Sequence, residues 1–280
     1  MIATTRLRML LALGAAMALV LVACGDDDAA PDEAAPDEAA EDPGDLELAE
    51  DGMIEVGTDA DFAPFEFVED GEFAGFDIDL FTEVADRLGH DIEFVNTPFD
   101  GIITALAGGQ FDALISAMTI TDERAETISF SDPYFAANQA LSVLADADLA
   151  SVDDLTEGTV VGAQAGTTGL DYAYDNFEEQ GTEIREFPTS GAAFDALEGD
   201  QLDAVFIDLP AAGERVDASG GAVEVAEEVD TGELYGIGVP QESENLLAAI
   251  NDQLADIIDD GTYADMYGEW FEGDVPEQFQ

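Results

Sequence analysis

Residues 116–124 combine small hydroxyl side chains with an arginine. They follow the apolar residues 111–115, so they lie where a buried strand is expected to end. A guanidinium is a planar fork that can pair with both oxygens of a carboxylate, and Ser116 and Thr119 lie close to it in the sequence. The stretch therefore predicts a carboxylate-binding site around Arg124. The alternative is a surface ion pair of little energetic value between this arginine and its acidic neighbours Asp122, Glu123 and Glu126.

The surrounding chain alternates between strand and helix patterns. Residues 54–57 and 91–95 have the pattern of strands. The first of these strands runs into a loop, residues 58–65, which carries aromatic side chains at its tip. Residues 77–88 carry apolar side chains at helical spacing, and Gly89 is placed to end that helix. Alternation of this kind predicts an α/β fold with mostly parallel sheets and helices on their faces.

An internal repeat divides the chain into two similar halves. Residues 105–114 align with residues 196–205 through the shared pattern A-L-x-x-G-x-Q-x-D-A, and residues 56–59 align with residues 161–164. Each half then contains a strand, a loop, helices and a helix–strand unit. The repeat predicts two α/β lobes.

Ligands of open α/β sheets gather at the carboxyl ends of the strands. The repeat places these ends at residues 59–62, 116–119, 164–168 and 207–208. If the lobes face each other, the loops line one cleft whose groups suit a zwitterion. Arg124 and the hydroxyls would bind a carboxylate, while acids would bind an ammonium group and aromatic rings would enclose an apolar stem. The acids are Asp208 and Asp59, and the rings are Phe62 and Phe99.

Each of these assignments has a plainer alternative. Asp208 precedes Leu209 and could cap the next helix. Phe62 and Phe99 could belong to the core, Thr167 and Thr168 could form a local turn, and Gln164 could be a satisfied polar group after a buried strand.

Composition narrows the class of partner. The 280 residues contain 66 acids and 6 arginines, with no lysine, and have a formal net charge of −60. Such a surface repels nucleic acid and anionic lipid. It is typical of a salt-rich environment, because the Debye length falls to about 3 Å at molar salt. One cysteine and one histidine allow no internal disulfide and give little support for a metal site, so we expect no metal and no cofactor.

The N-terminal residues have the features of an export signal. Arg6 and Arg8 precede an apolar run that is short for a bilayer span and ends Leu-Val-Ala-Cys at Cys24. This ending resembles the bacterial lipobox, in which the cysteine is lipidated. We expect residues 1–23 to be a lipoprotein signal peptide and residues 24–52, rich in Asp, Pro and Ala, to be a disordered tether.

Several segments together resemble the extracytoplasmic solute-binding proteins of ABC importers for polar amino acids (family 3). The resemblance runs from about residue 53 to the C-terminus. The segments that carry it are residues 59–67, 75–80, 99–103, 116–124 and 130–134 in the first half and residues 166–168, 203–208 and 261–263 in the second.

The resemblance implies a periplasmic-binding-protein-like fold with two lobes joined by two crossover strands that close on the ligand. The crossovers are expected near residues 140–145 and 235–240. The first lobe would comprise residues 53–141 and 238–280, and the second residues 142–237. By motif, Arg124 would hold the ligand α-carboxylate with Ser116, Thr119 and the backbone near Thr168, and Asp208 would hold the α-amino group. Asp59, Phe62 and Phe99 would shape the side-chain pocket opposite Gln164, and Ala117 would act through its backbone.

The resemblance also implies function. The protein is expected to be a monomeric, lipid-anchored binding protein on the extracytoplasmic face of the membrane that delivers a free amino acid to a membrane permease. An acidic ligand would bury a second carboxylate without a partner, so glutamine or a basic amino acid is favoured. The alternatives are an enzyme of the same fold, such as a prephenate-type dehydratase, and a sensory lipoprotein that presents its ligand to a separate protein.

Overall fold

The computed structural model describes residues 46–50 and 52–280, which contain two five-stranded sheets and a small three-stranded one. The first sheet has the order β5 (Asp91–Asn96), β1 (Met53–Thr58), β6 (Ala113–Leu114), β13 (Gly238–Val239) and β7 (Ser129–Phe130). The second has the order β10 (Glu183–Phe187), β9 (Val160–Gln164), β11 (Ala204–Asp208), β8 (Phe135–Leu144) and β12 (Val223–Tyr235). The small sheet joins β2 (Asp61–Phe62), β3 (Glu66–Glu69) and β4 (Glu72–Ala74).

Both large sheets are mostly parallel, as the sequence predicts. In the first sheet only β13 runs against the other strands, and in the second only β8 does so. The small sheet is antiparallel and lies where the sequence suggested a loop around Phe62.

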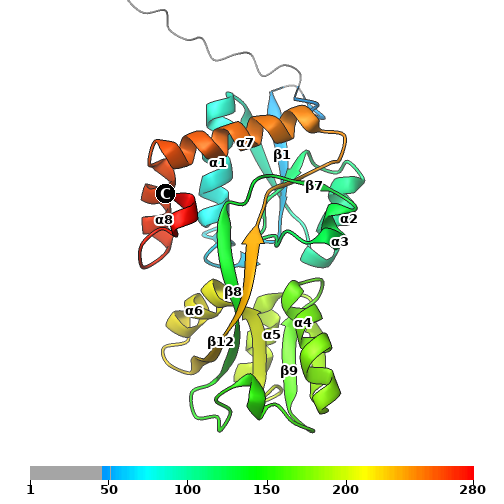
Figure 1. Ribbon diagram of the computed structural model, residues 1–280, viewed down its shortest axis with the longest axis vertical. Coiled ribbons are helices and arrows are strands. Elements are labelled where there is room, and N and C mark those ends of the chain that lie inside the picture. Colours follow the sequence, from blue (N-terminus) through cyan, green and yellow to red (C-terminus); the bar gives the residue numbers. More distant parts are fainter. Residues whose placement is uncertain (1–45, 51) are drawn as a thin grey trace, which may run out of the picture. The chain divides into compact units, whose positions relative to one another are not determined.

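Helices accompany each sheet, so that two α/β lobes result (Figure 1). The first lobe has α1 (Phe76–Leu88), α2 (Phe99–Ala107), α3 (Asp122–Ala125), α7 (Glu244–Asp259) and α8 (Thr262–Trp270). The second has α4 (Thr168–Phe177), α5 (Ser190–Glu198) and α6 (Leu209–Ala218). Short 3-10 turns span Val152–Asp154, Glu178–Gln180 and Glu277–Phe279. The predicted helix at residues 77–88 is confirmed, and Gly89 ends it in the left-handed conformation at φ 75°.

The internal repeat is reproduced in the strand register. Ala113 pairs with Val56 in the first sheet, and Ala204 pairs with Val161 in the second. The aspartate before each alanine accepts a backbone N–H from the neighbouring strand, at 2.9 Å for Asp112 and 2.8 Å for Asp203. The repeated Q-x-D-A pattern thus has a structural cause, because its carboxylate holds two strands in register.

Strands β8 and β12 connect the lobes as an antiparallel ribbon from Leu144–Val223 to Phe135–Tyr235 (Figure 1). Tyr235 also pairs with Thr119 next to the first sheet. We expected the first crossover at residues 140–145. The structure places its start earlier in the chain, because β8 begins at Phe135. The apolar and small side chains along β8 do not mark where that strand leaves one lobe for the other.

The described chain begins inside the segment expected to be a tether. Leu46 is 4% exposed, and the Ala49 N–H donates to the Asp112 carboxylate at 2.8 Å. Residues 46–50 therefore pack on the first lobe, which corrects the expected start near residue 53. The expected signal peptide and Cys24 lie outside the described residues. Across the described parts of the chain, no helix has the length and apolar character needed to cross a membrane.

Candidate ligand-binding site

One small cavity between the lobes brings together every residue predicted for the site. Strand ends supply the acids and amide: Asp59 follows β1, Gln164 ends β9 and Asp208 ends β11. The complete lining is Asp59, Phe62, Phe99, Ser116, Ala117, Thr119, Arg124, Gln164, Thr167, Thr168 and Asp208. The repeat therefore located the strand ends correctly.

Arg124 faces this cavity rather than its acidic neighbours in sequence. Its guanidinium donates to the Thr119 carbonyl at 2.7 Å and to the Gly166 carbonyl of the other lobe at 3.0 Å. It also lies over the Phe99 ring, 5.5 Å from the centroid. No ion pair joins it to Asp122, Glu123 or Glu126, so the alternative of a local surface pair is wrong. A guanidinium has five N–H donors, and those not used here remain for a ligand carboxylate.

Asp208 is 7% exposed and occupies the N-cap position of α6, but its side chain makes no capping hydrogen bond. Its carboxylate accepts hydrogen bonds from the Gln139 amide and the Tyr235 hydroxyl. Burial and, after it, the nearby charge of Glu233 together raise the pKa of Asp208 to about 7. A buried acid of this kind favours a cationic group beside it.

Asp59 lies in the same cavity and is 6% exposed. It accepts one hydrogen bond from the Gln164 amide across the cleft at 2.7 Å, so Gln164 is more than a locally satisfied polar group. Burial raises the pKa of Asp59 to about 6; the Gln164 amide opposes this rise, and the charge of Asp61 adds to it. No cationic side chain pairs with Asp59 in the part of the chain that the structure describes.

The hydroxyl groups correct one expectation. Ser116 donates to Glu66 at 2.7 Å, and Thr119 and Thr168 donate to Glu233 at 2.8 and 2.7 Å. Each hydroxyl has one hydrogen, which a glutamate occupies, so each can offer the cavity only a lone pair. We expected Ser116 and Thr119 to help bind a carboxylate; in this arrangement they suit an ammonium group.

The backbone part expected of Ala117 falls to its carbonyl group, because its N–H is used within the protein. This residue has φ 43°, and its N–H donates to Asp77 at 2.7 Å. That N–H is therefore occupied within the protein and cannot serve a ligand.

The remaining lining residues also stabilise the fold around the cavity. Phe62 is 8% exposed and belongs both to the core and to the cavity wall. Thr167 caps α4 by accepting the Leu170 N–H at 3.1 Å, as the turn alternative suggested, while Thr168 makes its bond to Glu233.

The sequence did not identify the polar groups behind the cavity wall. Glu66 and Asp77 stand between aromatic and aliphatic neighbours, a pattern that could have marked them as buried acids. Gln139, Glu233 and Tyr235 come from the β8–β12 ribbon. No local pattern shows that these three meet the strand ends.

Two α/β lobes that close on a small polar cavity define a two-lobed solute-binding protein. Residues 54–273 match the family model of bacterial extracellular solute-binding proteins, family 3, and the chain belongs to this family.

Known relatives share most of the folded chain. The histidine-binding periplasmic protein of Escherichia coli K12 is 32% identical over 230 residues, which cover 79% of this chain and 88% of the relative. The structure is similar to an ancestral arginine-binding protein bound to arginine, with 39% identity, a TM-score of 0.76 and coverage of 79% and 98% of the two chains. It is also similar to an ancestral amino acid-binding protein that is a precursor of cyclohexadienyl dehydratase, with 37% identity, a TM-score of 0.74 and coverage of 79% and 96%.

Proposed function

We propose that the protein binds a free cationic amino acid, with arginine as the best fit, and delivers it to the permease of an ABC importer. The observation that carries this proposal is the charge of the cavity. Its lining contains two carboxylates, Asp59 and Asp208, and one guanidinium, Arg124.

The lining has one net negative charge when all three groups are ionised. A cationic amino acid, with a net charge of +1, neutralises it. A neutral amino acid such as glutamine leaves one buried charge uncompensated, and an acidic one leaves two. Because burying an uncompensated charge is costly, the cavity favours a cation.

The positions of the charges match the groups of such a ligand. Arg124 suits the α-carboxylate, since a guanidinium pairs with both of its oxygens. Asp208 suits the α-ammonium group together with the lone pairs of Ser116 and Thr119. Asp59 suits the cationic end of the side chain, and the rings of Phe62 and Phe99 suit its aliphatic stem.

Two of the relatives described above support the same ligand class, because their names give histidine and arginine. The proposal also includes export through residues 1–23, lipidation at Cys24 and action as a monomer on the extracytoplasmic face of the membrane. Mass spectrometry of the protein from membranes would test the anchor, because a diacylglyceryl group on Cys24 changes the mass of the N-terminal peptide.

A thermal-shift screen of the protein against all standard amino acids, in molar salt, tests the proposed ligand. A ligand at 100 times its dissociation constant should add about 2.7 kcal/mol to the free energy of unfolding. Arginine, lysine or histidine should give the largest shift. No shift with any amino acid would refute the proposal, and a larger shift with glutamine would refute the cationic ligand.

Two further experiments address the alternative functions. Incubation with prephenate should give no aromatic product, whereas a dehydratase would release one. Loss of arginine uptake in a deletion strain separates transport from ligand presentation to a sensor.

A further inference from the structure

Two buried carboxyl groups lie side by side behind the cavity wall. Glu66 on β3 and Asp77 on α1 are both 0% exposed, and their side chains lie within hydrogen-bonding reach of each other. No cation pairs with either of them within residues 46–50 and 52–280. Two adjacent carboxylates without a cation would cost several kcal/mol each in lost hydration, so both cannot be ionised.

The hydrogen bonds show where a proton fits. One oxygen of Glu66 accepts from the Ser116 hydroxyl at 2.7 Å. One oxygen of Asp77 accepts from the Ala117 N–H at 2.7 Å and from the Tyr134 hydroxyl at 2.8 Å. The other oxygen of each, Glu66 Oε2 and Asp77 Oδ1, is buried without a donor. A single proton held by the two carboxyl groups would supply a donor that the pair otherwise lacks.

We propose that Glu66 and Asp77 share one proton, and that the protonated pair positions Ser116 and Ala117 at the edge of the ligand cavity. Glu66 draws the Ser116 hydrogen away from the cavity and leaves a lone pair facing it. Asp77 holds the N–H of Ala117, whose backbone has φ 43°. The Asp59 N–H also donates to the Ser116 hydroxyl, at 3.0 Å, so the pair supports two neighbouring parts of the site.

The charges around the pair favour this protonation state. Burial raises the pKa of Glu66 well above its ordinary value, and the charge of Asp77 raises it further. Burial raises the pKa of Asp77 to about 6, while the Ala117 N–H and the Tyr134 hydroxyl oppose the rise. The groups facing the pair are Asp59, Ser116, Tyr134 and, behind Tyr134, Tyr235. All are anionic or neutral, so none of them compensates a second negative charge. Asp77 accepts two hydrogen bonds and Glu66 accepts one, so the proton resides on Glu66 and Asp77 is the carboxylate.

Substitution of Glu66→Gln provides the test, because glutamine copies a protonated glutamate. Its amide oxygen can accept from Ser116 and its amide N–H can donate to Asp77. Glu66→Gln should keep ligand affinity within about threefold, whereas Glu66→Ala removes both contacts and should weaken affinity about tenfold or more. Glu69→Gln is the matched control, because it removes a charge from an exposed position on the same strand.

A titration of stability without ligand separates proton sharing from a merely structural effect. The raised pKa means that the folded state holds the proton, so its stabilising effect is lost as the pH rises through that pKa. As the pH rises from about 5 through the raised pKa of Glu66, wild type and Glu69→Gln should lose stability that Glu66→Gln retains. Parallel curves for wild type and Glu66→Gln would overturn the inference, as would equal damage by Gln and Ala. This comparison remains decisive if Glu66→Ala does not fold.

The positioning part of this inference rests on the proposed function, but the proton sharing does not. If no amino acid binds and the stability curves still differ, the proposed function alone fails. If arginine binds and the curves are parallel, the shared proton alone fails.

Discussion

Substitution of Asp59→Asn isolates the charge that we assign to the side-chain end of the ligand. Asparagine has nearly the same shape and keeps an oxygen for the Gln164 amide, which now bonds to Asp59 at 2.7 Å. The substitution therefore removes one charge at a position that is 6% exposed and alters little else.

The expected loss follows from the burial of this carboxylate. Removing one partner of a buried charge pair costs about 2–5 kcal/mol, and the remaining amide hydrogen bond places the loss near 3 kcal/mol. This corresponds to about a hundredfold weaker arginine binding. Glutamine cannot compensate the Asp59 charge, so removing that charge should leave its affinity unchanged or raise it.

Isothermal titration calorimetry with arginine and with glutamine, in molar salt, measures both affinities. Asp61→Asn is the matched control, because it removes the same charge from an exposed residue nearby. At molar salt the Debye length is about 3 Å, so this control should bind arginine nearly as well as wild type. A fall of less than about fivefold for arginine in Asp59→Asn, or an equal fall for glutamine, would refute the assignment.

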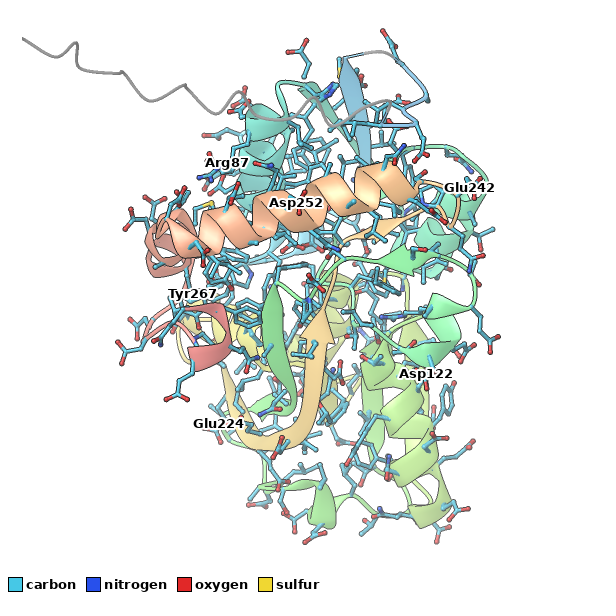
Figure 2. All side chains as sticks on the ribbon, turned by 45° about the horizontal axis from the view of Figure 1, so that its top comes forward. Arg87, Asp122, Glu224, Glu242, Asp252 and Tyr267 are labelled. Carbon is cyan, nitrogen blue, oxygen red and sulfur yellow. The ribbon has the colours of Figure 1, made fainter. Side chains whose placement is uncertain are left out.

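The remaining predictions concern the rest of the site and the fold. Arg124→Ala should weaken binding of every amino acid by about 2–5 kcal/mol, because the α-carboxylate loses its partner; selective loss of cationic ligands in calorimetry would contradict this. Burial raises the pKa of Asp59 to about 6 and that of Asp208 to about 7, so arginine must displace protons at low pH. Affinity should therefore rise from about pH 5 to about pH 8, and a flat profile would exclude a cationic ligand held by these acids. Gly57→Ala should cost about 1–3 kcal/mol in chemical denaturation, because a Cβ there would strike the Phe111 ring; an unchanged midpoint would show that the ring moves freely. Finally, many side chains with oxygen tips project outward in Figure 2, among them the exposed Glu224, Glu242 and Asp252. Salt screens the repulsion between these carboxylates, so the melting temperature should fall when salt is removed. A melting temperature independent of salt would contradict this reading of the surface.

Local pattern was sufficient for most of the secondary structure. The helix ending at Gly89 follows from apolar spacing and a residue that adopts a positive φ. The equivalence of β1–β6 with β9–β11 follows from a repeated pattern whose aspartates hold the strands in register. These features depend on residues that are near one another in the sequence or that recur at matching positions, so a single chain reveals them.

The repeat also located the site. In each lobe, the strands of the repeated pattern end at the edge of the sheet that faces the cavity. Asp59, Ser116, Gln164 and Asp208 all line the cavity for this reason. The family resemblance then indicated which end of the cavity suits each group of an amino acid.

The directions of the hydrogen bonds and the protonation of the acids could not be predicted in this way. Ser116 is an acceptor toward the cavity because Glu66 takes its hydrogen, and those two residues are far apart in the sequence. Asp208 is held by Gln139 and Tyr235 from the β8–β12 ribbon, where no local pattern marks them. A residue type limits what a side chain can do, but burial and long-range neighbours set its charge and its free donors, and these arise only when the two lobes are folded and packed together.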